Sequence, residues 1–362
     1  MLTRGDEFPI HQTPEPIAFS GTDRNFYDRY FFNGYEADGG NFFAIAFGVY
    51  PHLNVADAHF SCLRGDTQHC LHASRQLDME RMDLQVGPIR IEIVEPLKVL
   101  RVIVEAHDGI AAELTFTGRA FPLEEPRFIR RNGPRTFMDY TRMTQNGHWE
   151  GWISVDGVKK DIRGAVGTRD RSWGIRPIGA ADAQPLAPPM TPQFFWLWSP
   201  VNFANGSLFF HINADEQGKP WNTRAVWCPD GAHEGGMEET DACTMSVKLR
   251  EGWRHAVSAS LEIRGQDPLL ASFKPLKPFL MSGIGYGHPK WPHGGWKGAL
   301  EIEREDIDLT AIASGRGDHL HIQAISHVTL ERQGKVEQGI GILEQMILGP
   351  YAPLGLETLL DG

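Results

Sequence analysis

Residues 169–174, with the sequence Arg-Asp-Arg-Ser-Trp-Gly, combine charged and aromatic side chains in a way that suits a site. Asp170 is either a proton donor or a member of a structural salt bridge, because a guanidinium that pairs with it lowers its pKa. Arg169 or Arg171 could hold a carboxylate or phenolate through two parallel hydrogen bonds. Trp173 is either a core aromatic at a tight turn or a ligand contact.

Two residues elsewhere could move protons. His293 lies in a glycine-rich loop, 291–296, whose bare backbone lets a ligand approach, and it is either an acid–base group or an exposed loop side chain. Glu344 alternates with Ile340 and Ile342, so one apolar strand face carries a carboxylate. Such a carboxylate either faces a pocket with a raised pKa or pairs with an arginine.

These residue types suit the addition of water to an alkene, or the isomerisation of one. Both reactions need a proton delivered to carbon by an acid kept protonated in an apolar pocket, and aromatic faces that stabilise the resulting cation. The predicted set is Asp170, His293 and Glu344 as catalytic groups, with Arg169, Arg171, Trp173, Trp196, Trp198 and Trp296 as substrate contacts.

The histidine spacing does not predict a metal site. His319 and His321 would share one strand face, and His69 and His72 form a second pair, but spacing places no third ligand or carboxylate beside either pair. The nucleophile elbow, the phosphate-binding loop and the dinucleotide-binding motif are absent from the sequence. We therefore expect neither a metal nor a cofactor.

Composition excludes several classes of partner. The 362 residues carry a formal charge of -11, which is unfavourable for binding nucleic acid. No apolar run reaches the roughly 18 residues of a spanning helix, and the first residues do not form a secretory signal. We expect a cytoplasmic protein without a membrane segment, with its four cysteines reduced.

The hydrophobic pattern predicts a mainly β protein. Alternating runs are punctuated by turn signals, of which Asp156-Gly157 is the clearest hairpin turn. The proline-rich segment 179–192 reads as a connector. The length then suits two antiparallel β-barrels of lipocalin (calycin) type packed together, at residues 1–185 and 186–362.

Four motifs resemble the lipocalin-like superfamily of AttH-type proteins and carotenoid 1,2-hydratases. They are Arg169-Asp-x-Ser-Trp-Gly174, Glu95-Pro-Leu-Lys98, His288-Pro-x-Trp-x-His-Gly-x-Trp-x-Gly298 and Gly339-Ile-Gly-Ile-Leu-Glu-Gln345. The resemblance implies two β-barrel domains and a cavity for a large apolar or isoprenoid-like molecule. Two positions depart from the hydratase pattern: Arg171 replaces a histidine, and Trp196-Leu-Trp198 stands where that branch has a tyrosine and an acid.

Three hypotheses follow. The first is a cofactor-independent hydratase, isomerase or cyclase acting on a hydrophobic isoprenoid, polyketide or aromatic molecule in a barrel or interdomain pocket. The second is a non-catalytic carrier of such a ligand, and the third is a protein whose central motif only joins two barrels. The sequence does not determine the oligomeric state.

Overall fold

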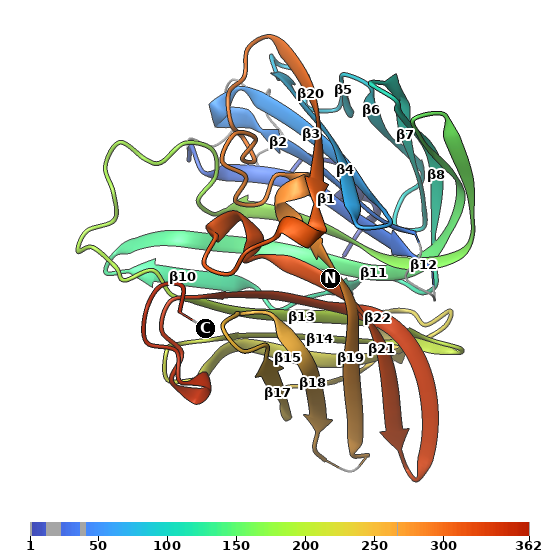
Figure 1. Cartoon of the computed structure of the whole chain (residues 1–362), viewed down its shortest axis with the longest axis vertical. Helices are drawn as coiled ribbons and strands as arrows, with labels where there is room; N and C mark the ends of the chain where they lie inside the picture. Colours follow the sequence, from blue (N-terminus) through green and yellow to red (C-terminus); the bar gives the residue numbers. More distant parts are fainter. Residues whose placement is uncertain (1, 12–22, 37–40, 266, 362) are drawn as a thin grey trace. The chain divides into compact units, whose positions relative to one another are not determined.

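The computed structural model describes residues 2–11, 23–36, 41–265 and 267–361. Within these ranges the regular structure consists of β-strands and short 3-10 helices, without any α-helix (Figure 1). The prediction of a mainly β protein is therefore confirmed. A search of the same residues finds no helix that is both long and apolar enough to span a membrane.

The chain forms two compact units. Unit 1 comprises Met1–Glu36, Gly40–Met190 and Gly283–Ile307, and unit 2 comprises Thr191–Ser282 and Asp308–Gly362. Unit 1 thus includes a segment, 283–307, that the sequence analysis assigned to the second half of the chain. The alternation of a strand pattern shows that a segment pairs, but it does not show which sheet it joins.

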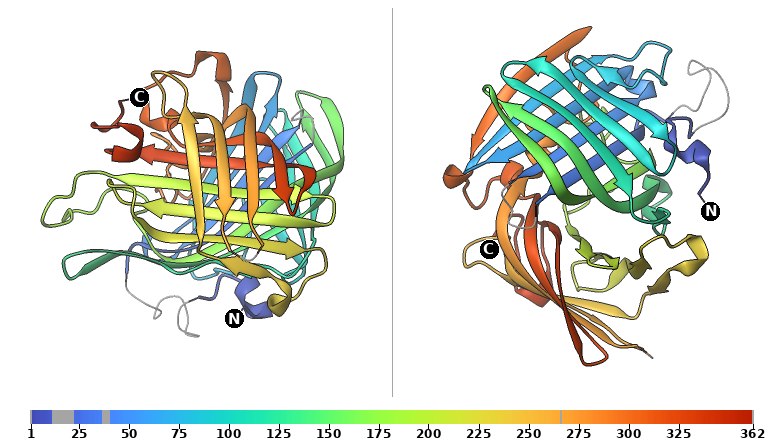
Figure 2. Two further views of the ribbon diagram at one scale, coloured as in Figure 1. Left: turned by 90° about the horizontal axis from the view of Figure 1, so that it is seen from below. Right: turned by 90° about the vertical axis from the view of Figure 1, so that its right-hand side faces the viewer.

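Unit 1 is built on one sheet. Its strands are β1 (Phe26–Tyr35), β2 (Phe42–Tyr50), β3 (Val55–Arg64), β4 (Thr67–Gln76), β5 (Gln85–Val86), β6 (Ile89–Glu95), β7 (Val99–His107), β8 (Ile110–Gly118), β9 (Leu123–Glu124), β10 (Phe128–Asn132), β11 (Arg135–Val155), β12 (Val158–Ile175) and β20 (Leu300–Asp308). The order is β20-β4-β3-β2-β1-β12-β11-β8-β7-β6-β5, with β9 and β10 paired to β11. The sheet curls on itself, as a lipocalin-like barrel does (Figure 2).

Unit 2 is built on a second curled sheet. Its strands are β13 (Phe194–Phe203), β14 (Gly206–Ala214), β15 (Pro220–Pro229), β16 (Glu238–Thr240), β17 (Cys243–Leu249), β18 (Ala256–Ile263), β19 (Leu269–Leu280), β21 (Ile322–Arg332) and β22 (Lys335–Leu348). They lie in the order β16-β15-β14-β13-β22-β21-β19-β18-β17. The 3-10 helices of the chain are η1 (Arg4–Glu7), η2 (Pro51–Leu53), η3 (Glu234–Gly236), η4 (Met281–Ile284), η5 (Leu309–Ala311), η6 (Gly317–His319) and η7 (Ala352–Leu354).

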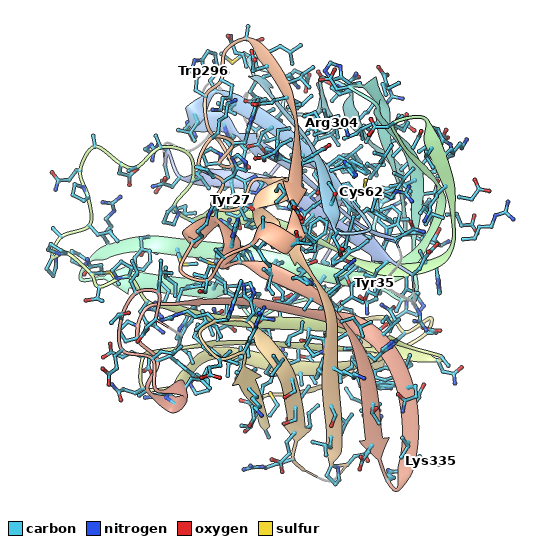
Figure 3. The ribbon with its side chains drawn as sticks, in the orientation of Figure 1. Tyr27, Tyr35, Cys62, Trp296, Arg304 and Lys335 are labelled. Carbon is cyan, nitrogen blue, oxygen red and sulfur yellow. The ribbon has the colours of Figure 1, made fainter. Side chains whose placement is uncertain are left out.

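Two hairpin turns follow directly from the sequence. Asp156 and Gly157 have φ values of 50° and 79° and join β11 to β12, as the Asp-Gly turn signal predicts. Gln333 and Gly334, with φ values of 52° and 74°, join β21 to β22, and Lys335 lies at the tip of that hairpin (Figure 3). Positive φ at both central residues matches the right-handed twist of the flanking strands.

Aromatic side chains fill the interior of the unit 1 barrel. Trp149 is fully buried and makes edge-to-face contacts with Phe43 and Phe116, each with ring centres 5.2 Å apart. Phe32 contacts the same indole at 5.9 Å, and the Trp149 Nε1–H donates to the carbonyl of Asn33 at 2.8 Å. The interior is a packed core, and a ligand site must be sought elsewhere in this unit.

The strand β3 is buried on both of its faces. Ala56, Ala58 and Phe60 belong to the barrel core, whereas Asp57 and His59 point to the opposite face because side chains alternate along a strand. Both are nevertheless almost inaccessible to solvent. They are covered by the chain segment 283–299 of the same unit, which we call the covering segment.

Candidate functional site

The central motif lies on β12, where side chains alternate between two faces. Arg169 and Arg171 face the barrel core, and the Arg171 guanidinium stacks 3.9 Å from the ring centre of Tyr30. Arg169 donates hydrogen bonds of 2.7 and 2.9 Å to Glu7, and Arg171 pairs with Asp28. Buried carboxylates thus already neutralise both guanidinium groups, which favours a structural role over contact with a substrate.

Trp173 packs against the N-terminal segment of the protein. The ring of His11 stacks on the indole with 3.6 Å between ring centres, and His11 Nδ1 lies 2.9 Å from Asp28 Oδ2. Burial raises the pKa of Asp28, but the charge of Arg171 and the contact with His11 outweigh it, and the pKa is lowered. These contacts favour the packing role of Trp173.

Asp170 points to the opposite face of β12 and is 7% exposed. Its charge helps to raise the pKa of two buried arginines, Arg29 and Arg142, against the effect of burial, which lowers it. Asp170 therefore lies among cations, as in the salt-bridge alternative. Its role as a proton donor stays a prediction.

Glu344 belongs to unit 2. Its sequence context predicts either a raised pKa or an arginine partner, and the structure shows neither. Its carboxylate accepts hydrogen bonds from Trp196 Nε1 at 2.9 Å and Gln323 Nε2 at 2.6 Å, and His321 Nε2 lies 2.8 Å away. Burial raises the pKa of Glu344, but the contacts with these three groups outweigh it, so the pKa is lowered. The partners are a histidine, an amide and an indole, so the prediction of a raised pKa or an arginine partner is corrected.

The lowered pKa of Glu344 predicts how stability depends on pH. The folded carboxyl takes up a proton less readily than the unfolded one, so its contribution is present above the ordinary value near 4.5 and is lost as the pH falls below it. We expect the urea midpoint of unit 2 to fall between pH 6 and pH 3.5, and to fall less in Glu344→Gln. Glu331→Gln, at an exposed position of β21, is the control. Equal slopes in wild type and Glu344→Gln would contradict this assignment.

The remaining predicted residues are dispersed. Trp198 is buried opposite Glu344 in the β13–β22 register, whereas Trp296 is 57% exposed.

The histidine pairs noted in the sequence are not shared sites. His69 points away from His72 and contacts Asp306 at 3.0 Å.

The second pair, His319 and His321, is also separated. The first ends the 3-10 helix η6 and accepts the backbone N–H of Ala313, and the second contacts Glu344. The expectation that the two share one strand face is therefore wrong, because His319 is not in a strand.

His293 lies in the wall of a pocket of unit 1 with a volume of about 240 Å³. Its ring packs edge-on against Tyr286 at 4.7 Å and against His59 at 5.2 Å between ring centres. Burial lowers the pKa of His293 to about 3, and the nearby charge of Arg29 contributes, while Asp57 opposes the shift. The lining residues are Arg24, Asn25, Arg176, Pro177, Ile178, Gly179, Ala180, Ala181, Asp182, Gly285, Tyr286, Gly287, Pro292 and His293.

Behind His293 lies a buried cluster of imidazoles and carboxylates that the sequence analysis missed. His59 and His72 face each other across β3 and β4, with their Nδ1 atoms 2.9 Å apart. The covering segment contributes His288 and His293, and β20 contributes Glu305. The polar residues of β3 alternate with apolar ones, as in a strand with one solvated face, so no local pattern shows that this face is buried or which histidines complete the cluster.

The cluster divides into two groups that could each hold a metal ion. The inner group is Asp57, His59 and His293, and the outer group is His72, His288 and Glu305. Within each group the potential ligand atoms lie within 4.8 Å of one another. Burial raises the pKa of Asp57, but the neighbouring imidazoles of His293 and His59 lower it by more. The pKa of Asp57 is therefore below its ordinary value.

Arginine and tyrosine side chains lie beside the same pocket. Arg29 is 2% exposed, and its guanidinium lies 4.7 Å from the ring centre of Tyr286 and 5.3 Å from that of Tyr27. Its Nε and Nη1 have no hydrogen-bond acceptor among the residues that the structure describes. Arg176 lies 5.2 Å from the Tyr27 ring and 5.7 Å from the Tyr286 ring.

Comparison with known proteins places the chain among AttH-type lipocalin-like folds. An AttH-type protein of Nitrosomonas europaea covers 93% of this chain and 98% of its own, with a TM-score of 0.50 and 14% identity. Kievitone hydratase of Nectria haematococca covers 88% of each chain, with a TM-score of 0.53 and 12% identity. CghA, solved with Sch210972, covers 94% of this chain and 95% of its own, with a TM-score of 0.52 and 12% identity.

These similarities confirm the predicted resemblance and the fold class of two lipocalin-like antiparallel sheets. No curated protein matches the chain. A family model described as a family of unknown function (DUF8625) matches residues 2–357.

Proposed function

The chain belongs to the family of unknown function DUF8625, and we propose that it is an enzyme that transforms a small molecule in the pocket at His293, by hydration, dehydration, isomerisation or cyclisation. One observation carries the proposal. The imidazole of His293 lies at the pocket wall, 5% exposed, and neither of its nitrogens has a hydrogen-bond partner in the described part of the chain. A buried imidazole left in this state is suited to act on a bound molecule.

The surroundings of His293 support proton transfer. Asp57 Oδ1 lies 3.7 Å from His293 Nδ1, and the Asp57 carboxylate is buried. That carboxylate is itself held by the backbone N–H of Gly294 at 2.7 Å and the hydroxyl of Tyr50 at 3.1 Å. A fixed carboxylate beside an imidazole orients the ring and stabilises positive charge on it.

The charges around the pocket support an acidic or phenolic substrate. Arg24 is paired with Asp182, whereas Arg176 has no carboxylate partner among the described residues. With Arg29 behind Tyr286, the pocket offers a cation that can bind a carboxylate or phenolate. The volume of about 240 Å³ suits a small molecule or one end of a longer one.

Kievitone hydratase is a hydratase by name, and its fold is similar to that of this chain. This likeness agrees with the proposed reaction class. The substrate class proposed here rests instead on the residues of the pocket.

Isotope incorporation tests the proposal. The protein is incubated with a panel of unsaturated acids, such as cinnamic and 4-hydroxycinnamic acid, in D₂O or in H₂¹⁸O, and the acids are analysed by mass spectrometry. We expect at least one acid to gain deuterium at carbon, or ¹⁸O, faster than without protein. An acid that raises the unfolding temperature without any incorporation would contradict catalysis and support the carrier. If no acid binds, the proposed substrate class is wrong.

A further inference from the structure

We propose that Asp57, His59 and His293 form a binding site for a divalent transition metal ion, with Zn²⁺ as the first candidate. The proposal departs from the expectation of a metal-free protein. It does not rest on the proposed activity, because metal binding is measured without a substrate. Two imidazoles and one carboxylate are a ligand set that suits Zn²⁺ and leaves a further coordination position open.

The distances within the inner group suit an ion better than hydrogen bonds. His59 Nε2 lies 3.8 Å from Asp57 Oδ2, and His293 Nδ1 lies 3.7 Å from Asp57 Oδ1. Both separations exceed those of hydrogen bonds. Two ligands at about 2.0–2.1 Å from a tetrahedral zinc ion lie about 3.3 Å apart, so a small contraction of the group would complete the site.

The donor atoms are buried and lack partners. His59 is 1% exposed, Asp57 2% and His293 5%. His59 Nε2 and both ring nitrogens of His293 make no hydrogen bond within the described ranges. Buried polar atoms are almost always satisfied in folded proteins, so the two unpartnered nitrogens beside the Asp57 carboxylate, His59 Nε2 and His293 Nδ1, point to a missing ligand.

The hydrogen bonds of His288 determine which of its two ring nitrogens carries the proton. His288 Nδ1 accepts the backbone N–H groups of Lys290 at 3.0 Å and of Trp291 at 2.7 Å. The proton of the neutral ring must therefore be on Nε2, which lies 2.8 Å from Glu305 Oε2 and donates to it. With its lone pair engaged in this way, His288 cannot bind a metal, which argues against the outer group.

The tautomer of His72 in turn determines that of His59. His72 Nε2 lies 3.5 Å from the Glu305 carboxylate, which is too long for a hydrogen bond, but this negative charge favours the His72 tautomer that carries its proton on Nε2. His72 Nδ1 then accepts a hydrogen bond from His59 Nδ1–H, at 2.9 Å. In this tautomer the lone pair of His59 is on Nε2, 3.8 Å from Asp57 Oδ2, and a cation between these two acceptors would satisfy both.

This arrangement matches that of known metal ligands. A histidine that binds a metal usually donates its other ring N–H to a neighbouring acceptor, which fixes the tautomer. His72 serves as that acceptor for His59, and Glu305 in turn orients His72. The Asp57 carboxylate is held by Gly294 N–H and the Tyr50 hydroxyl.

Gly285 leaves the space that the site needs. A Cβ at this position would lie 2.9 Å from His59 Nε2 and 3.0 Å from His293 Cε1. The φ of Gly285 is 94°, which also favours glycine. A side chain here would enter the space between the two imidazoles.

Metal binding is tested on the full chain, stripped with EDTA and titrated with Zn²⁺ against a chromophoric chelator. We expect about one ion per chain with a dissociation constant below about 1 µM. Co²⁺ in its place should give the intense visible absorption of a low-symmetry site with nitrogen ligands. His59→Asn and His293→Asn should each weaken binding more than about 100-fold, since lost outer partners alone cost 10- to 100-fold.

Two controls separate the inner group from its alternatives. His327→Asn removes an exposed imidazole of unit 2 and should leave the affinity unchanged. Unfolding curves of all variants check that the fold persists, and His293→Asn is the decisive variant because it lies in a loop. Absence of Zn²⁺ binding by the wild type would overturn the proposal. So would ion binding that survives His59→Asn and His293→Asn but is lost in Glu305→Gln.

Discussion

Replacing Glu7 with alanine is expected to lower the free energy of unfolding by about 3–5 kcal/mol, because it leaves the Arg169 guanidinium buried without its counter-charge. Arg169 and Glu7 are 1% and 0% exposed and share two hydrogen bonds. Glu7 also accepts the backbone N–H of Leu97 at 2.7 Å. Urea denaturation followed by circular dichroism measures the change.

The matched control is Glu95→Ala. Glu95 pairs with Lys98 at the surface, where the two side chains are 50% and 60% exposed. An exposed pair of this kind contributes about 0–1 kcal/mol. We also expect Arg169→Met to cost less in the Glu7→Ala background than in the wild type. A loss below about 1 kcal/mol in Glu7→Ala would contradict the structural role of the central motif.

Replacing His293 with asparagine is expected to lower turnover by about 10²–10⁴-fold, the usual contribution of a positioned proton-transfer group. The substrate is whichever acid shows isotope incorporation with the wild type. Asparagine is smaller than histidine and stays polar, so the pocket keeps its shape to a first approximation. His327→Asn, in unit 2, should leave the rate unchanged.

Measuring the zinc content of the same samples distinguishes the loss of a metal ligand from the loss of a group that acts directly on the substrate. If His293→Asn lowers both turnover and zinc content, the residue acts as a metal ligand. If turnover falls while the bound ion remains, the residue acts on the substrate directly and the inner metal site is wrong. An unchanged rate would contradict the proposed function of the pocket.

The central motif shows how sequence reasoning can select important residues and misjudge their role. Residues 169–174 are the most site-like run in the chain, and its charged residues Arg169, Asp170 and Arg171 are buried in the structure. Their partners, Glu7 and Asp28, come from the N-terminal segment and β1. A guanidinium that binds a substrate and one that binds a distant glutamate look the same in sequence.

His293 was predicted from its glycine-rich loop, but the cluster around it was not. Its neighbours Asp57, His59 and His72 lie more than 200 residues earlier, on β3 and β4. The sequence paired His69 with His72, three positions apart, which places them on opposite faces of a strand. The alternation of Asp57 and His59 with apolar residues predicts a solvated face for β3, and only the structure shows that this face is buried.

The sequence by itself determined the β class, the hairpin turns and the alternation that buries one face of strands such as β7 and β8, because these depend on neighbouring residues and on backbone geometry. Only the tertiary structure decided that 283–307 returns to unit 1 and covers the second face of β3 and β4. Contacts of this kind depend on the register and closure of a whole sheet, which brings together residues that have no relation along the chain.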